Sequence, residues 1–143
     1  MKCDIEKFFD TISHETLLSI LHTRIKDKEL MNLLTEVIES FTSDRSTLFE
    51  RCGVPIGNLT SQLFANVYMD VFDQFMKHEL KVKYYARYTD DFVIVSENKE
   101  YLIQLLPKIR SFLKDKLQVQ IHPKKITITK FGRGIDYLGY VLF

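Results

Sequence analysis

Asp90 and Asp91 stand side by side in the string Tyr88-Thr89-Asp90-Asp91, between apolar runs at residues 84–86 and 92–95. Both runs are rich in the aromatic and β-branched residues that favour strands. Burying adjacent carboxylates costs free energy unless a metal ion or another positive charge compensates for their charge. The string therefore predicts a β-hairpin whose tip carries both carboxylates at a metal site.

Asp4 supplies a third carboxylate near the start of the chain, in the segment Cys-Asp-Ile-Glu-Lys-Phe-Phe-Asp at residues 3–10. Residues 1–5 are predicted to form a short buried strand, which would place Asp4 on a second strand. A lone Asp-Asp pair is weak evidence, because most such pairs lie in solvated turns. Three carboxylates from two strands, however, are the minimum for a two-metal site that performs phosphoryl transfer.

The composition is that of a globular domain, with 143 residues of which 45% are hydrophobic. No long apolar run or charged leader is present, so membrane insertion is not expected, and two cysteines are too few for a disulfide framework, which fits the cytoplasm. Residues 1–76 carry 7 basic and 12 acidic side chains, and residues 77–143 carry 13 and 7. This asymmetry indicates either a metal-binding half and a phosphate-facing half or two ordinary solvated faces.

Four helices are predicted from apolar residues at helical spacing, from Ser13 to about Ile25 and over residues 28–41, 60–77 and 98–116. Ser13 is the expected N-cap of the first. Pro107 is expected to kink or divide the last. The inward faces predicted for the second and third helices comprise Leu30, Leu33, Leu34, Val37, Ile38 and Phe41, and then Leu63, Val67, Val71 and Phe75.

Further strands are predicted at residues 47–51, 119–121, 126–129 and 136–143, and two glycines and a proline make residues 53–58 a turn. The predicted fold class is α+β, with a mainly antiparallel sheet, helices packed on one face and a hairpin that carries the carboxylates. His14 is expected to pack at the start of the first helix rather than bind a metal ion, because no second ligand lies at a suitable spacing.

Five segments, in this order, resemble the palm motifs of reverse transcriptases. They are Asp4 to Asp10 with Ile12 and His14, Gly53 to Asp73 with Asn66 and Tyr68, Tyr88-Thr89-Asp90-Asp91, Leu117 to Ile128 with Lys125, and Tyr137-Leu138-Gly139-Tyr140. The likeness extends over nearly the whole chain. It implies a polymerase palm, and because the family's fingers motifs and thumb are not seen, residues 1–143 are expected to be one palm domain of a longer protein.

The resemblance implies a metal centre for Mg²⁺, or alternatively Mn²⁺. Asp4 and Asp90 would be the main metal ligands, with Asp91 as the third catalytic carboxylate and the carbonyl group of Ile5 as a further ligand. Lys125 would lie near the departing pyrophosphate as a general acid or electrostatic stabiliser, with Lys124 as an adjacent competitor and a solvated strand lysine as the plain alternative.

The resemblance also implies contacts with the nucleotide and the primer. Phe9 would be the aromatic gate that excludes a 2′-hydroxyl, unless it is simply a core neighbour of Phe8. The backbone N–H groups of Phe8 and Phe9 would meet the triphosphate. The string Pro55-Ile56-Gly57 would pack against the nucleotide and template, and Tyr137, Leu138 and Gly139 would form the primer grip.

Two positions depart from the usual family pattern. Ile56 stands where many reverse transcriptases have glutamine, and Ser61-Gln62 replaces the more usual Ser-Pro. The string around them looks like the enzymes of diversity-generating retroelements, with group II intron and retron enzymes of bacteria as the next alternatives. The loss of a polar side chain at the nucleotide leads us to expect looser base selection.

The function that the resemblance implies is RNA-directed DNA polymerisation, with an RNA template, a DNA primer and dNTPs as partners and an accessory protein left open. The isolated palm is expected to be inactive, since it lacks fingers and thumb. Phe9 argues against an RNA-directed RNA polymerase, and Tyr88 argues against a nucleotide cyclase; a non-catalytic palm remnant that binds nucleic acid is the third alternative. Side chains proposed to contact nucleic acid are Tyr84, Tyr85, Arg87, Lys124, Lys125, Lys130 and Arg133, although core and surface roles explain the tyrosines and arginines nearly as well.

Overall fold

The structure, a computed structural model, describes residues 1–41, 51–55 and 59–142. Its strands are β1 (Lys2–Asp4), β2 (Tyr84–Tyr88), β3 (Asp91–Val95), β4 (Ile135–Tyr137) and β5 (Tyr140–Leu142). Its helices are α1 (Phe8–Thr11), α2 (His14–Arg24), α3 (Lys28–Glu39), α4 (Leu59–Gln74) and α5 (Lys99–Leu117), with a π-helical turn at Phe75–Glu79 and a 3₁₀ turn at Phe131–Arg133. No helix in these ranges is long and apolar enough to cross a bilayer.

The main sheet has the strand order β1-β3-β2, and both pairings are antiparallel. The central strand β3 pairs Asp91 with Asp4 of β1 on one side and with Tyr88 of β2 on the other. Strands β2 and β3 form the predicted hairpin, and Thr89 at its tip has a left-handed backbone with φ of 50°. The sheet therefore places the N-terminal segment directly beside the carboxylate-bearing hairpin.

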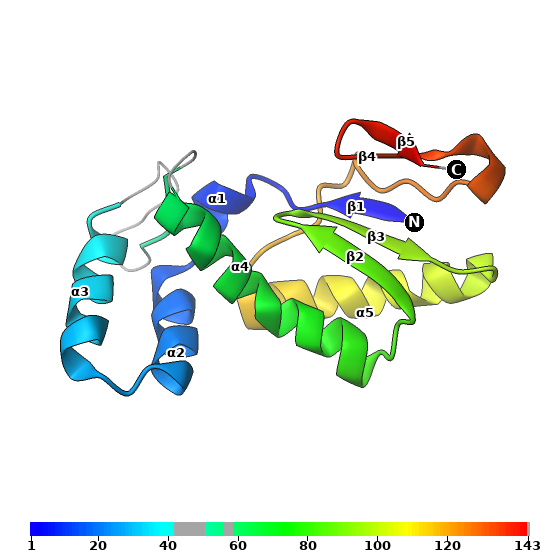
Figure 1. The fold of residues 1–143 in the computed structure, drawn as a ribbon. Coiled ribbons are helices and arrows are strands. Elements are labelled where there is room, and N and C mark those ends of the chain that lie inside the picture. Colours follow the sequence, from blue (N-terminus) through cyan, green and yellow to red (C-terminus); the bar gives the residue numbers. More distant parts are fainter. Residues whose placement is uncertain (42–50, 56–58, 143) are drawn as a thin grey trace.

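Helices α4 and α5 lie against one face of this sheet (Figure 1). The ring of Phe72 on α4 meets the rings of Phe92 on β3 and Tyr85 on β2, with centroids 5.1 and 6.0 Å apart. Along β2 the side chains alternate, so that Tyr85 and Arg87 are partly buried while Tyr84 and Tyr88 are exposed. The α+β class with helices on one face is confirmed.

Tyr68 of α4 connects the helices to one another. Its hydroxyl donates a hydrogen bond to the carbonyl oxygen of Leu117 at 2.6 Å and accepts one from the backbone N–H of Ser13 at 3.3 Å. Ser13 is the predicted N-cap, because its side chain accepts a hydrogen bond from the backbone N–H of Thr16. Burial raises the pKa of Tyr68 to about 12, so the hydroxyl remains neutral at physiological pH.

The predicted inward faces of two helices are right only in part. On α4, Val67, Val71 and Phe75 pack against the core, but Leu63 is 61% exposed, because the fully buried stripe of this helix is turned toward α2 and the sheet. On α3, Leu30 and Leu33 are exposed because this helix packs mainly against α2, with Met31 and Ile38 buried. The residues of the buried stripe of α4 are Ser61, Phe64, Ala65, Tyr68, Met69 and Phe72.

The predicted strands near the C-terminal end also need correction. Residues 119–121 and 126–129 contribute only the isolated bridges Ile5–Ile121 and Lys2–Thr127, because a turn that includes Pro123 interrupts the pairing. The strand predicted at 136–143 is divided into β4 and β5 by a left-handed turn at Leu138 and Gly139, whose φ angles are 56° and 79°.

Pro107 does not divide α5, contrary to one of the two expectations. Pro107 has no N–H group, so the carbonyl group of Ile103 loses its usual helical hydrogen-bond partner. Both residues are exposed, so the proline leaves no buried carbonyl group without a partner. Most of the strand predicted at 47–51, and residues 56–58 of the predicted turn, lie outside the described residues. Gly53, the first residue of that predicted turn, has φ of 102°, a backbone conformation that glycine adopts without steric cost.

Candidate active site

The three predicted carboxylates lie at one end of the main sheet. Asp4 ends β1 and faces Asp91 across the β1–β3 pairing, and Asp90 directly precedes Asp91 at the hairpin tip. The backbone N–H of Ile5 donates a hydrogen bond to the carbonyl oxygen of Asp90 at 3.2 Å, which extends the contact between the two segments. Asp4 and Asp91, which are 87 positions apart in the sequence, are thus neighbours through ordinary strand pairing.

The pKa of Asp91 reflects its position among these carboxylates. Its pKa is raised, first because the carboxyl group is partly buried and also because the negative charges of Asp4 and Asp90 lie near it. Lys2, whose Nζ lies 3.6 Å from Asp91 Oδ2, opposes the shift. Asp4, Asp90 and Asp91 carry three negative charges, and their two lysine partners, Lys2 and Lys125, carry two positive charges. An added cation would therefore be stabilised there.

Lys125 reaches the site from the segment that follows α5. Its Nζ donates a hydrogen bond to Asp4 Oδ1 at 3.0 Å, although the side chain is 57% exposed. The hydrogen bond and charge of Asp4, followed by the charges of Asp91 and Asp90, raise the pKa of Lys125. Lys124 is exposed, and its backbone N–H donates a hydrogen bond to His122 Nδ1. Of the two adjacent lysines, Lys125 is therefore the one whose side chain contacts the carboxylates.

The donor set suits Mg²⁺ or Mn²⁺, because carboxylate oxygens are the ligands that these hard cations prefer. In the part of the chain that the structure describes, however, no three acidic, histidine or cysteine side chains converge as a ready metal site. Oxygens of Asp4 and Asp91 face the ammonium groups of Lys125 and Lys2 instead. The residue types fit a metal centre, at which an ion would compete with these lysines for the carboxylates.

The residues expected at the nucleotide lie beside the carboxylates in sequence. Phe8 is a fully buried core residue, while Phe9 is partly buried and meets Phe8 edge to face with ring centroids 5.5 Å apart. The carbonyl oxygen of Phe9 accepts a hydrogen bond from the N–H of Val54 at 2.8 Å, which ties the first motif to the second. Pro55 is partly buried nearby in sequence, and residues 56–57 lie outside the described residues.

His14 strengthens the same connection, as a packing residue. Its side chain is 3% exposed, and its Nε2 forms a hydrogen bond with the carbonyl oxygen of Gly53 at 2.8 Å. The expectation that His14 packs at the start of the first helix is confirmed, since it is the first residue of α2. The start of α2 thereby fixes the position of the turn that begins at Gly53.

The expected primer-grip residues Tyr137, Leu138 and Gly139 form the end of β4 and the turn before β5. Partial burial raises the pKa of Tyr137, and the charge of Asp91 raises it further while Arg87 opposes the shift. Tyr137 therefore lies within electrostatic range of Asp91. Leu138 is 47% exposed, so its side chain is available for contact.

A family model described as reverse transcriptase (RNA-dependent DNA polymerase) matches residues 1–142. This chain belongs to the reverse transcriptase family.

Similar proteins include the Group II intron-encoded protein LtrA of Lactococcus lactis subsp. cremoris, which is 22% identical over 200 aligned residues that cover 96% of this chain and 33% of LtrA. The putative COX1/OXI3 intron 2 protein of Saccharomyces cerevisiae is 31% identical over 57% of this chain and 10% of that protein. Protein YkfC of Escherichia coli is 36% identical over 53% of this chain and 20% of YkfC. The chain thus spans a third or less of the length of these relatives, two of which are named as intron proteins.

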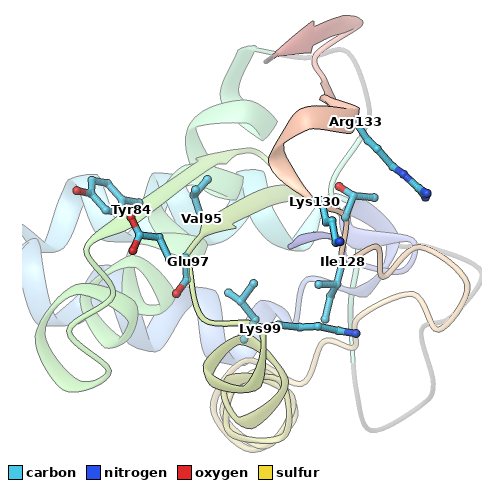
Figure 2. Close-up of a pocket in the computed structure, with 10 residues that line it drawn as sticks. Tyr84, Val95, Glu97, Lys99, Ile128, Lys130 and Arg133 are labelled. Carbon is cyan, nitrogen blue, oxygen red and sulfur yellow. The ribbon is translucent and has the colours of Figure 1, made fainter.

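A cleft of this reverse transcriptase chain, drawn in Figure 2, has a different location from the carboxylates. It has a volume of about 870 Å³ and includes Tyr84 and Val95, which are at the opposite end of the β2–β3 hairpin from Asp91. Basic side chains from three segments line it, namely Lys99, Lys130 and Arg133. Two of the predicted basic residues are therefore cleft residues, and Lys99, which sequence reasoning missed, joins them.

Tyr85 and Arg87 do not belong to an exposed nucleic-acid track. The hydroxyl of Tyr85 donates a hydrogen bond to Asp73 Oδ1 at 2.6 Å, and Arg87 forms an ion pair with the same carboxylate. Sequence reasoning missed this role for Asp73 and Arg87. The period-2 pattern of the strand contained the signal, because Arg87 alternates with the exposed Tyr84, Ala86 and Tyr88 and so points to the helical face.

Proposed function

We propose that the whole protein is an RNA-directed DNA polymerase in which this chain is the catalytic palm. The polymerase would add dNTPs to a primer 3′ end on an RNA template. The observation that carries the proposal is the register of β1 and β3, which sets Asp4 opposite Asp91 with Asp90 beside it, in a chain that belongs to the reverse transcriptase family. Oxygen ligands from two strands are what two-metal nucleotidyl transfer requires.

In this proposal Asp4, Asp90 and Asp91 hold the metal ions, and the Ile5 carbonyl group is a further ligand. Bound Mg²⁺ would stabilise the negative charge on the attacking oxygen and on the leaving pyrophosphate. Lys125 supplies a proton or a positive charge to the pyrophosphate, since its ammonium group already lies at the carboxylates. A lysine side chain is protonated at neutral pH, as either role requires.

Phe9 is proposed to select deoxynucleotides. Its ring lies at the margin of the core rather than inside it, and it follows Asp4 by five positions at the start of α1. The backbone N–H groups of Phe8 and Phe9 are proposed to contact the triphosphate, with Pro55, Ile56 and Gly57 on the nucleotide and template side. Tyr137, Leu138 and Gly139 are proposed to hold the primer end, supported by the electrostatic interaction of Tyr137 with Asp91.

The nucleic acid is proposed to cross the palm toward the cleft formed by Tyr84, Lys99, Lys130 and Arg133. Lysine and arginine side chains bind phosphates without regard to sequence, as a polymerase requires of its template and primer. We place the enzyme in the group II intron class of bacterial type and in the cytoplasm, the latter because both cysteines are free thiols in the structure.

The test uses the full-length enzyme with an RNA template, a DNA primer and Mg²⁺. Asp90→Asn keeps the shape of the side chain but removes its charge, so DNA synthesis should be abolished while the thermal unfolding midpoint changes little. Asp115→Asn is the matched control, because Asp115 is exposed on α5 and bonds only Ser111 of the same helix among the contacts described. Extension by Asp90→Asn at the wild-type rate would remove Asp90 from the site, and synthesis of RNA rather than DNA would refute the polymerase class.

A further inference from the structure

The tip of the β2–β3 hairpin has an unfavourable backbone conformation. Thr89 has φ of 50°, in the left-handed region that β-branched residues rarely adopt. The next residue is Asp90, so any relaxation of Thr89 rotates or displaces that carboxylate. A site that depends on Asp90 therefore requires another part of the protein to hold Thr89 in place.

Arg87 makes that contact from within the same hairpin. Its Nη1 donates a hydrogen bond to the carbonyl oxygen of Thr89 at 2.9 Å and lies 3.4 Å from Asn66 Oδ1 of α4. The side chain of Arg87 is only 8% exposed, and its guanidinium lies on the helical side of the sheet. Arg87 thus binds the backbone of the strained tip directly and from the protein interior.

Asp73 of α4 fixes Arg87 through both of its oxygens. Nε of Arg87 donates to Oδ1 at 2.9 Å and Nη2 donates to Oδ2 at 2.7 Å, an arrangement that only a guanidinium can make. Tyr85 donates a further hydrogen bond to the same carboxylate at 2.6 Å. The orientation of Arg87 is therefore set by a helix of the core and not by the hairpin itself.

Thr89 continues this chain of contacts to the candidate site. Its hydroxyl donates a hydrogen bond to Asp90 Oδ1 at 2.7 Å, so one residue both receives Arg87 on its carbonyl group and orients the carboxylate of Asp90. The connected order is Asp73, Arg87, Thr89 and Asp90. It runs from the helical layer to the site and reaches it at Asp90.

We propose that Arg87 is a positioning residue of the reverse transcriptase site, and that Asp73 and Arg87 together hold the Thr89 turn so that Asp90 is correctly placed for metal binding. This inference rests on the proposed function for its catalytic consequence. A guanidinium can bind Asp73 with two N–H groups and Thr89 with a third, whereas the single ammonium group of lysine cannot reproduce this geometry.

A second ion pair on the same helix serves as an internal comparison. Arg24 of α2 pairs with Asp70 of α4, which lies about one helical turn from Asp73. This pair is more exposed than the Arg87–Asp73 pair, and its described contacts do not include the hairpin tip. Asp70 is also within electrostatic range of Arg87, but loss of the Arg24–Asp70 pair removes none of the hydrogen bonds that Arg87 makes to Asp73 and Thr89. Its loss should therefore affect α4 much more than the carboxylates.

The experiment compares full-length Arg87→Lys, Asp73→Asn and Arg24→Gln enzymes with the wild type. Arg87→Lys and Asp73→Asn should lower kcat by at least about tenfold and raise the Mg²⁺ concentration for half-maximal rate, because small misplacements of catalytic groups have large kinetic effects. Arg24→Gln should change neither quantity. A purely structural role would lower the unfolding midpoint and leave the Mg²⁺ requirement unchanged well below that temperature, and this result would overturn the proposal.

The Thr89→Asn variant tests the connection through the turn. Asparagine tolerates the left-handed region and keeps a side-chain donor, so the tip should depend less on Arg87. Arg87→Lys should therefore lower kcat less in the Thr89→Asn background than in the wild type, and equal losses in the two backgrounds would contradict the proposal.

Hydrogen exchange separates this inference from the proposed function. If Arg87 holds the turn, Arg87→Lys should increase backbone exchange in the peptide that contains residues 88–91, whereas Arg24→Gln should not. If exchange increases in Arg87→Lys but the wild-type enzyme makes no DNA, the proposed polymerase function is contradicted and the positioning role of Arg87 is supported. Unchanged exchange in Arg87→Lys would overturn the positioning role even if the wild type makes DNA.

Discussion

Lys125 Nζ donates a hydrogen bond to Asp4 Oδ1 at 3.0 Å, across 121 positions of sequence. One carboxylate is thus the partner of both the candidate general acid and the proposed metal ion. In the proposed mechanism, the metal ion would compete with the ammonium group for Asp4, and the released lysine would approach the pyrophosphate. This competition makes the role of Lys125 measurable.

Replacing Lys125 should have two opposite effects in the full-length enzyme. Lys125→Ala should lower kcat by about 100-fold through loss of the general acid, and should lower the Mg²⁺ concentration for half-maximal rate because Asp4 loses its competing partner. Lys124→Ala is the matched control and should show neither effect. Steady-state rates over a Mg²⁺ titration measure both, and a Lys125→Ala enzyme with an increased Mg²⁺ requirement would contradict the competition.

The side chain of Phe9 should determine the choice of sugar. Phe9→Val frees space beside the nucleotide, so the ratio of ribonucleotide to deoxynucleotide incorporation should rise by at least tenfold, about 1.4 kcal/mol of lost discrimination. Phe9→Tyr keeps the ring and should keep the wild-type ratio. The ratio of kcat/KM values for a matched dNTP and NTP is the measurement, and an unchanged ratio in Phe9→Val would make Phe9 a packing residue.

The alkaline stability of the fold should depend on Tyr68. Its pKa is about 12 in the folded chain, against 10.0 for an unperturbed tyrosine. The folded state holds this proton more tightly, so the stabilisation is complete below pH 10 and is lost as the pH rises from 10 to about 12. Tyr68→Phe should cost about 1 to 2 kcal/mol at pH 8, through loss of the hydrogen bond to Leu117.

The difference in unfolding free energy between wild type and Tyr68→Phe should therefore shrink between pH 10 and about 12. Burial also raises the pKa of Cys3 to about 11, and burial together with Asp73 raises the pKa of Tyr85, so both proteins lose stability at high pH. The comparison isolates the contribution of Tyr68. Urea unfolding at several pH values measures it, and a difference that stays constant with pH would refute the assignment.

The basic cleft should contribute salt-dependent binding of a primer–template duplex. Lys130→Gln and Arg133→Gln should each reduce the slope of log affinity against log salt concentration by about 1 if each side chain contacts one phosphate. Lys108→Gln on the exposed surface of α5 is the control and should leave the slope unchanged. Equal slopes for all variants would exclude the cleft from phosphate binding.

The sequence predicted those parts of the structure that depend on local patterns. The hairpin around Asp90 follows from strand composition on both sides of a polar pair, and the Ser13 cap follows from its place before an apolar stripe. The inward face of α4 could not be predicted in this way, because α4 packs against both α2 and the sheet and its apolar residues surround more than one face. The predicted stripe is therefore right only in part, because Leu63 is exposed whereas Val67, Val71 and Phe75 pack against the core.

The contact between Asp73 and Arg87 lay beyond local patterns for a different reason. It joins a helix to a strand, and its existence depends on how α4 crosses the sheet rather than on the spacing of either residue. The same holds for Lys125 and Asp4, which the family resemblance brought together but strand propensity did not. Residues 119–129 have strand-like alternation, yet the turn at 122–125 limits them to isolated bridges.

Those two bridges bear on the proposed role of Lys125. The segment that carries Lys125 is joined by isolated bridges to Lys2 of β1 and to Ile5, which directly follows β1, whereas β3 is paired along its length on both sides. Segments with few backbone contacts open locally at a small fraction of the free energy of global unfolding. In the proposed mechanism, Lys125 would therefore leave and return to Asp4 within each nucleotide addition while the sheet that carries the carboxylates stays paired.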